Sequence, residues 1–320
     1  MTTLKDLIKE HRNIKESSAK IYNGNVERIR KHFKKEDNLN YQFLLDDYKE
    51  IIKYISNMNT LQTRKVYYVS IVVALQALKM FNTKAGTAYN DMMLNSHNEY
   101  NIKRKDQLKS EKQKSAWATY KDLKNVYKYY KNKIKIQRIR KKKELTNKEF
   151  NLLKKFIILS LYLSDPENNP PRRIRDYSTM LISKKLPEED IDNNILYYKN
   201  SRKKVFFFND YKTSSKYGEQ ILNVGRVLNN DLNLWLKYNK TNYLLPNKKK
   251  TLNMSPTNLT KFLQKIFFKR IGKNISVNLI RSIILSEYYK DVPKLSNMES
   301  LAAKMGHSVN EALSSYVKKD

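Results

Sequence analysis

The chain has no cysteine, which excludes disulfide bridges, thiolate zinc sites and a cysteine nucleophile. It has no run of about 18 apolar residues, so no membrane-spanning helix is expected. The first residues, Met1–Asp6, lack the apolar segment of a secretory signal, so an intracellular protein is expected. Four histidines and no paired-carboxylate motif offer little from which to build a metal centre. We therefore expect neither a metal nor a cofactor.

Acidic residues are scarce relative to basic ones. Lys and Arg together number 64 against 31 Asp and Glu, which gives a formal net charge of +33. That excess is far larger than solubility requires, and it makes a polyanion the expected partner. The positive charge is spread along the chain instead of lying on one amphipathic helix, which favours nucleic acid over a membrane surface.

The first hundred residues show helical periodicity. Thr60 is suited to be an N-cap, and the helix after it is expected to place four apolar residues on one face: Val66, Val69, Val73 and Ala77. Two interpretations of this region remain: a small helical bundle with a solvated basic surface, or a bundle that lays basic helix faces on DNA. The net charge favours the second.

A chain of 320 residues should contain about two domains. Residues 101–115 are polar, rich in lysine and nearly free of apolar residues, so we expect an interdomain linker there. The expected domains are residues 1–112 and residues 113–320.

The second domain is expected to be mainly helical. An amphipathic stretch runs from Trp117 to Ile136, and later helix starts are indicated by a capping box at Thr146–Glu149, by Ser255-Pro256 and by Ser276. Strand signals occur only in the middle of the domain, at Ile195–Tyr198, Val205–Phe208 and Gln220–Val224. The predicted fold class is therefore mainly α, with a small antiparallel three-stranded sheet in the second domain.

The last forty residues combine chemically useful groups. Arg281 follows Asn278 by three positions, Gly306 precedes His307, and Tyr316 comes nine positions after that histidine. Each residue alone is more typical of an ordinary surface or core position. Together they supply a hydroxyl nucleophile, an imidazole and an arginine that can hold phosphate oxygens, which is a set suited to breaking a phosphodiester.

At this point the sequence resembles the tyrosine recombinase (integrase) family, in the style of integrases of giant viruses and virophages. Leu301–Ser308 looks like the family's Leu-Gly-His-Ser segment, with Met305 in the leucine position. Asn278–Arg281 looks like the His-x-x-Arg box, with Asn in place of His. Pro170–Tyr177 resembles the first arginine box, and Tyr211-Lys212-Thr213 sits in a predicted hairpin turn, as the family's lysine does.

The resemblance implies residue roles. It selects Arg173, followed three positions later by Asp176, as the first catalytic arginine, with Arg172 as the close competitor. It selects Lys212 over Lys216 as the lysine that protonates the leaving 5′-oxygen. The remaining implied catalytic residues share the C-terminal segment, with His307 as a hydrogen-bond donor: Asn278, Arg281, His307 and Tyr316.

The resemblance also implies an activity and an organisation. Residues 113–320 would form the catalytic domain, and the N-terminal region would be a helical, SAM-like core-binding domain. The chain would cut and rejoin double-stranded DNA through a 3′-phosphotyrosyl intermediate without metal or ATP, acting as a homo-oligomer, expected to be a tetramer on synapsed DNA. Family members usually continue past the tyrosine into a helix that docks on a neighbouring subunit, whereas four residues follow Tyr316 here.

Two alternative functions remain at this stage. One is a type IB DNA topoisomerase, which uses similar residues and also cuts without a metal. The other is a DNA-binding protein of the same fold that has lost catalysis. Relaxation of plasmid DNA separates the first from a recombinase, and covalent trapping on DNA separates the second.

Overall fold

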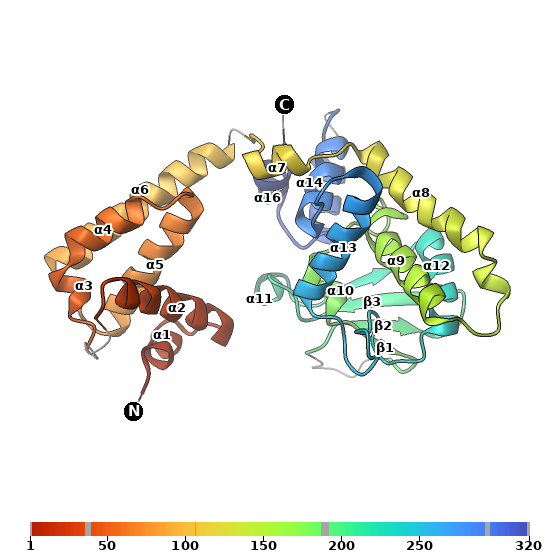
Figure 1. Cartoon of the computed structure of the whole chain (residues 1–320), viewed down its shortest axis with the longest axis horizontal. Coiled ribbons are helices and arrows are strands. Elements are labelled where there is room, and N and C mark those ends of the chain that lie inside the picture. The colour runs from red at the N-terminus through yellow and green to blue at the C-terminus, as the bar shows by residue number, and fades with distance from the viewer. Residues whose placement is uncertain (1, 36–39, 106, 187–191, 292–294, 319–320) are drawn as a thin grey trace. The chain divides into compact units, whose positions relative to one another are not determined.

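The structure is a computed structural model that describes residues 2–35, 40–105, 107–186, 192–291 and 295–318. The chain divides into two compact units, Met1–Asp106 and Gln107–Asp320 (Figure 1). The division falls between residues 106 and 107, whereas the sequence placed it between 112 and 113. Within the described ranges, no helix is both long and apolar enough to cross a bilayer.

The predicted polar linker at 101–115 is largely helical, so that prediction was wrong in extent. Helix α6 spans Lys84–Lys105, and α7 spans Glu111–Ala116. Helix α7 starts at a capping box in which the Gln113 amide donates to Ser110 Oγ at 3.3 Å and the Ser110 amide donates to Gln113 Oε1 at 3.0 Å. A polar sequence can form an exposed helix when its first turn is capped in this way.

Unit 1 is a helical bundle, as the periodicity predicted. Its helices are α1 Leu4–Arg12, α2 Glu16–His32, α3 Phe43–Asp46, α4 Tyr48–Ser56, α5 Leu61–Ala77 and α6. Thr60 is the N-cap of α5, because its hydroxyl accepts from the Thr63 amide at 3.1 Å.

The predicted buried face of α5 was wrong. Val73 is buried, but Val66, Val69 and Ala77 are only partly so, and residues 70–75 are buried all the way around the helix. Helix α5 contacts α1, α2, α4 and α6, so neighbours cover most of its circumference. A helix surrounded in this way has no single buried face for a periodic pattern to reveal.

Unit 2 is also mainly helical. Its longer helices are α8 Tyr120–Ile136, α9 Asn147–Leu163, α12 Arg226–Tyr238, α13 Pro256–Ile271, α14 Val277–Tyr288 and α15 Leu295–Lys304, and its short ones are α7, α10 Ile174–Ser178, α11 Ser214–Tyr217 and α16 Val309–Glu311. The predicted helix starts are confirmed: Thr146 forms a capping box with Glu149, Ser255 caps a helix with Pro256 in its first turn, and Ser276 caps α14.

The sheet of unit 2 has four strands in the order β1-β2-β3-β4, where the sequence predicted three. Strands β2 Ile195–Tyr198, β3 Lys204–Phe208 and β4 Gln220–Asn223 are antiparallel, close to the predicted bounds. The missed strand is β1, Leu181–Ser183, which pairs in parallel with β2. Three residues are too few to show an alternating pattern, so the backbone pairing that makes β1 a strand is visible only in the fold.

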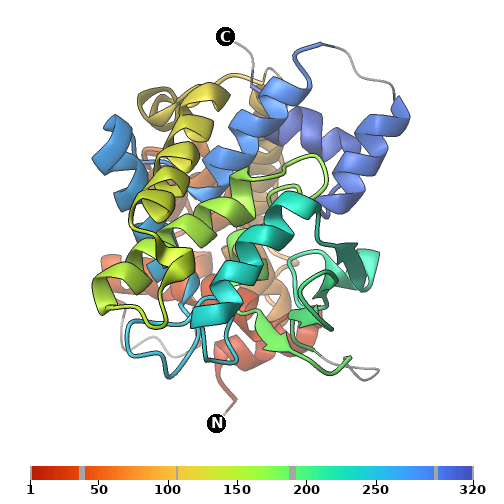
Figure 2. The same cartoon turned by 90° about the vertical axis from the view of Figure 1, so that its right-hand side faces the viewer.

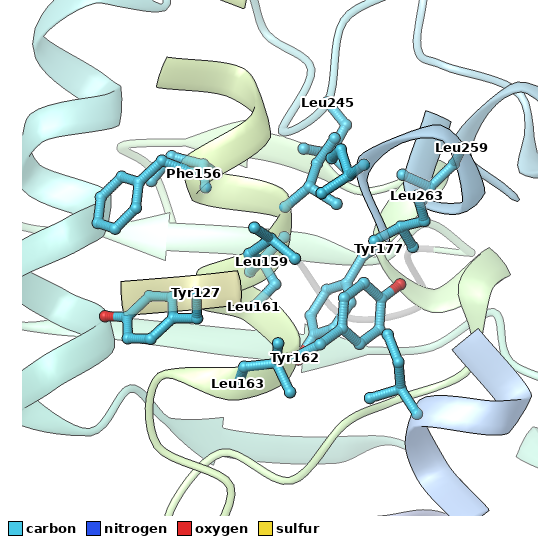
Figure 3. Close-up of a cluster of buried hydrophobic side chains, with 14 of the residues drawn as sticks. Tyr127, Phe156, Leu159, Leu161, Tyr162, Leu163, Tyr177, Leu245, Leu259 and Leu263 are labelled. Atoms are coloured by element: carbon cyan, nitrogen blue, oxygen red, sulfur yellow. The ribbon is translucent and has the colours of Figure 1, made fainter. Parts of the chain in front are cut away.

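The core of unit 2 is centred on α9, which is buried almost throughout its second half. Helices α8 and α12 both pack against α9, and they lie beside it in the view of Figure 2. Figure 3 shows side chains of α8, α9, α10 and α13 meeting in this core, including Tyr127, Tyr162, Tyr177 and Leu263. Burying an aliphatic or aromatic side chain of this size contributes about 1.5–3 kcal/mol, so the core holds α10 and the start of α14 firmly in place.

Candidate active site around Tyr316

The N-terminal turns of α14 direct Arg281 into the protein. Ser276 Oγ accepts from the Leu279 amide at 3.3 Å, which starts the helix where the sequence predicted. Arg281 is 0% exposed, and its Nη1 donates to the Pro171 carbonyl at 3.2 Å. Asn278 is exposed, and no hydrogen bond of its side chain occurs in the described part of the chain. The structure thus places Arg281 in the candidate site and leaves Asn278 at the surface.

The turn that carries His307 depends on Gly306. Helix α15 ends at Lys304, and Gly306 has a φ of 71°, a left-handed conformation that favours glycine. A Cβ at this position would also lie 3.3 Å from Arg172 Nη1. The chain therefore reverses tightly enough to bury His307, which is 3% exposed.

Three residues that are distant in sequence meet at Tyr316. The tyrosine lies at the end of a single π-helical turn, Ala312–Tyr316, and is partly exposed. Its ring stacks on that of His307 with centroids 5.2 Å apart and planes at 20°. The guanidinium carbon of Arg281 lies 4.7 Å from the centroid of the Tyr316 ring. The tyrosine, histidine and arginine singled out in the C-terminal segment are therefore in direct contact.

The first arginine box separates into a buried and a partly exposed arginine. Arg172 is 0% exposed, donates from Nε to Asp176 Oδ2 at 2.9 Å, and lies over the Phe208 ring at 4.2 Å. Asp176, whose position in the sequence selected Arg173 as the catalytic arginine, thus pairs with the competitor Arg172. Asp176 is also 0% exposed, so both partners of this ion pair are buried.

Arg173 reaches the site by another route. It is the N-cap residue of α10 and is partly exposed, and its Nη1 donates to the Gly306 carbonyl at 3.3 Å. Its guanidinium therefore lies at the turn that carries His307. Of the two arginines, Arg173 is the one whose side chain is accessible to a ligand from solvent.

The lysines of the hairpin lie at the surface. Lys212 and Lys216 are both between β3 and β4, as predicted, and both are exposed. Neither contacts Arg281, His307 or Tyr316 in the described structure. The residue next to Lys212 does reach the site, because Thr213 Oγ1 donates to the Gly306 carbonyl at 2.9 Å. The segment between β3 and β4 is thus anchored at the histidine turn, while its two lysines are exposed to solvent.

Gln220 and Thr213 are site residues that sequence reasoning missed. Gln220 Oε1 accepts from Arg172 Nη1, and its Nε2 donates to the Ala303 carbonyl at 3.0 Å. Arg172 Nη1 also donates to the Lys304 carbonyl at 2.9 Å. Gln220 is 83 positions from Ala303, and Thr213 is 93 positions from Gly306. No local pattern in the sequence indicates contacts over such separations.

Five buried polar atoms of the site have no hydrogen-bond partner among the residues that the structure describes: Arg172 Nη2, Arg281 Nε and Nη2, His307 Nε2 and Asp176 Oδ1. Leaving a buried charged donor unpaired costs several kcal/mol, so such atoms indicate a ligand that completes them. Three arginines and one aspartate make the site electropositive. An anion with several oxygens, such as a phosphate group, matches the unpaired guanidinium donors.

Burial shifts the protonation of the site. It raises the pKa of the Asp176 carboxyl, opposed by the attraction of Arg172, and it lowers the pKa of the Arg281 guanidinium. Burial, with repulsion from Arg281 as a smaller cause, lowers the pKa of His307 to about 4. The imidazole is therefore neutral at pH 7.

The contacts of His307 also fix its tautomer. Nδ1 lies 3.1 Å from the Ser308 carbonyl oxygen, so the ring proton is on Nδ1, where it can be donated. Nε2 then carries a lone pair at neutral pH. The expected role of His307 as a hydrogen-bond donor requires that an incoming anion raise its pKa, because the free site presents an acceptor.

The burial of His307 predicts a pH effect on stability. The unfolded chain binds a proton at this histidine below about pH 6.5, whereas the folded chain does so only below about pH 4. Stability is therefore full above the unfolded value and falls as pH drops through this window, by about 3 kcal/mol in total. Between pH 7 and pH 4, we expect the wild type to lose that amount of unfolding free energy relative to His307→Gln, which has no group that titrates at this position. Urea denaturation at the two pH values measures both proteins. An unchanged difference would contradict a buried neutral histidine.

In the described ranges, no three or more His, Asp or Glu side chains group closely enough to hold a metal ion. A scan against protein-family models, a search of curated proteins and a search of solved structures each found no match to this chain. The geometry of the site and the residues themselves therefore carry the functional argument.

Proposed function

We propose that this protein is a tyrosine recombinase or integrase, an enzyme that cuts and rejoins DNA strands with Tyr316 as nucleophile. The observation that carries the proposal is the contact of Tyr316 with His307 and Arg281, whose buried ring and guanidinium atoms lack partners. A tyrosine whose ring contacts a guanidinium with unpaired donors is suited to attack a phosphate that the guanidinium holds. The net charge of +33 supports double-stranded DNA as the substrate.

The proposed reaction transfers one phosphodiester. Tyr316 Oη forms a bond to the scissile phosphorus as its proton is released to solvent. The bond from phosphorus to the 5′-oxygen breaks as that oxygen takes a proton from the general acid. The products are a 3′-phosphotyrosyl enzyme and a free 5′-hydroxyl. A 5′-hydroxyl from a partner strand then reverses the step, and because the bond energy stays in the phosphotyrosine, neither ATP nor a metal takes part.

The residues around Tyr316 have distinct proposed roles. Arg281 and Arg173 hold the non-bridging oxygens, since planar guanidinium groups meet two oxygens at once. His307 Nε2 is an unpaired acceptor in the free site, and it donates a hydrogen bond once a bound phosphate has raised the pKa of the ring. Arg172 lies beneath them and orients the turn through the Lys304 carbonyl. Asn278, exposed on α14, has no role in this proposal.

The test is covalent trapping by the wild-type chain on nicked or suicide duplexes in the presence of EDTA. We expect a protein–DNA adduct that survives denaturation and carries the 5′-end label of the cleaved strand, whereas a 3′-end label is released with the 5′-hydroxyl fragment. An absence of adduct would contradict the proposal and favour a DNA-binding protein without catalysis. Supercoiled plasmid lacking any special site provides the second arm, since robust relaxation without strand exchange would instead indicate a type IB topoisomerase.

The general acid is predicted to be Lys212, with Lys216 as the alternative on the same hairpin. Replacing the acid with alanine should slow cleavage by about 10²–10⁴-fold, because the departing 5′-alkoxide would lack its proton. A 5′-bridging sulfur leaves as a thiolate without needing a proton, so the same variant should cleave that substrate at nearly the wild-type rate. Lys212→Ala and Lys216→Ala are matched controls for each other. The variant whose cleavage rate is restored by the 5′-bridging sulfur substrate identifies the general acid. If sulfur rescues neither, both assignments are wrong.

A further inference from the structure

A second basic surface lies at the edge of unit 2 away from α16, the helix that precedes Tyr316 (Figure 1). A hollow of about 460 Å³ is formed where the segment after α8 meets the end of α12 and a later loop. Four lysines line it, which are Lys143, Lys237, Lys240 and Lys250. The rest of the lining is one acid, Glu144, and three apolar or aromatic residues. In Figure 1 the connection from α8 to α9 is at one edge of unit 2, while α11 and α16 are at the opposite edge. We call these four lysines and their hollow the distal basic surface.

The loop that supports this surface is held in one conformation. Lys237 Nζ donates to the carbonyls of Arg140 and Lys142 at 2.9 and 3.0 Å. The Tyr238 hydroxyl donates to the carbonyls of Ile139 and Lys142 at 2.5 and 2.7 Å. Side chains of α12 thus satisfy the carbonyls of a basic loop, whose cationic side chains are left to face outward.

The second loop of this surface, between α12 and α13, is held by residues of α9. Lys154 is 3% exposed, and its Nζ donates to the Pro246 carbonyl at 3.0 Å. Lys250 Nζ lies 4.1 Å from the centroid of the Phe150 ring, and Lys154 Nζ lies 5.4 Å from the same centroid. Two ammonium groups therefore share one aromatic ring at the floor of the hollow. Burial and repulsion from Lys250 lower the pKa of Lys154 to about 8.

The surface carries a net positive charge, because its lining has four lysines and one acid, Glu144. None of the four lining lysines forms an ion pair in the parts of the chain that the structure describes. The two loops and the first turn of α9 carry further exposed basic residues, which are Arg138, Arg140, Lys141, Lys148, Lys248 and Lys249. Like charges held this close repel each other, and a bound anion would relieve that repulsion.

The chemistry of the surface favours a polyanion over a small ligand. Lysines are flexible point charges that suit successive phosphates, whereas a single nucleotide is held by arginine forks and buried polar groups. Of the hollow's lining residues, none is a buried polar side chain, and the charge continues beyond it along both loops. The backbone of a nucleic-acid duplex has this extended, regular charge.

We infer that the distal basic surface binds the backbone of a second DNA duplex while the Tyr316 site holds the first. The identification of DNA as the polyanion rests on the proposed function, because strand exchange requires two duplexes to be held together. Contact through lysines to phosphates carries no base preference, so the second duplex is bound without regard to its sequence.

The test compares two triple variants of the full chain that lose the same charge. The distal variant carries Lys143→Gln, Lys240→Gln and Lys250→Gln, and it keeps Lys237, which holds the loop. The control variant changes three exposed lysines outside this surface, which are Lys185→Gln, Lys199→Gln and Lys203→Gln. All proteins also carry Tyr316→Phe, so that duplex capture is measured without cleavage.

Protein is loaded on an immobilised duplex, and retention of a labelled second duplex is measured over a range of salt concentrations. We expect the distal variant to bind the first duplex as the parent does and to retain the second about tenfold less. Loss of three phosphate contacts should reduce the salt slope of second-duplex binding by about 2–3. The control variant should match the parent in both steps.

Three outcomes would overturn the inference. The first is second-duplex capture by the distal variant at the parent level, and the second is an equal loss in the control variant. The third is an equal loss of first and second duplex by the distal variant, which would place these lysines on the primary DNA surface. Failure of the proposed function would be seen in a different measurement. The wild-type chain would form no covalent adduct with DNA, while the distal variant would still retain less of the second duplex than the control variant.

Discussion

Tyr316→Phe is expected to abolish the covalent protein–DNA adduct. The substitution removes only the hydroxyl, so the ring should keep its stacking on His307 and its contact with Arg281. Without an oxygen to attack phosphorus no phosphotyrosine can form, and the loss should exceed the roughly 10²–10³-fold effect of removing one stabilising contact. The adduct is measured on suicide duplexes after denaturation, and DNA binding by the same variant should equal that of the wild type.

Tyr288→Phe is the matched control for this prediction. Tyr288 packs with Tyr316 against the same small apolar cluster of Leu285, Leu301, Met305 and Val317. A variant there should form the adduct at nearly the wild-type level. If Tyr316→Phe still forms an adduct, the nucleophile is another residue, and the assignment of this site is wrong.

Arg281→Met is expected to stabilise the protein while nearly eliminating cleavage. Arg281 is 0% exposed, yet its Nε and Nη2 have no partner and only Nη1 is hydrogen-bonded. An apolar side chain of similar length removes that unpaired buried charge at the cost of one hydrogen bond, so the free energy of unfolding should rise by about 1–3 kcal/mol. Cleavage should fall by about 10²–10³-fold, because the phosphate loses a cation that acts on it directly.

Opposite effects on stability and activity are what distinguish a functional arginine from a structural one. Denaturant midpoints and adduct yields, measured on the same preparations, check both halves of this prediction. Arg270→Met is the control, since Arg270 is an exposed arginine of unit 2 whose guanidinium lies over Tyr129 at 3.7 Å. A less stable Arg281→Met variant would indicate that Arg281 stabilises the fold. Its unpaired donors would then no longer support a phosphate-binding site.

Local features of the fold could be predicted from the sequence because they depend on neighbouring residues. The caps at Thr60, Thr146, Ser255 and Ser276 involve side chains within three positions of the amides they accept from. Three strands were predicted near their observed bounds for the same reason. Strand β1 and the burial of α5 were not predicted, because both depend on which elements surround a segment in space.

The site divides in the same way. The order and spacing of Arg281, His307 and Tyr316 identified them, and Gly306 marked the turn that the left-handed conformation requires. Asn278 was predicted from its position in the Arg281 box, but helix α14 turns it toward solvent. The helical period alone does not determine which of two residues on one turn is buried.

The sequence by itself determined that this is a mainly helical, strongly basic chain, with a tyrosine, a histidine and an arginine grouped near its end. Composition, helix caps and residue spacing depend only on the sequence or on residues close together in it, so they can be identified without the fold. Only the tertiary structure decided that Asp176 pairs with Arg172, that His307 is neutral with its Nε2 unpaired, and that Thr213 and Gln220 hold the histidine turn. Those facts follow from burial and from contacts between residues distant in sequence, which exist only once the core of unit 2 has brought α10, the β3–β4 hairpin, α14 and α15 together.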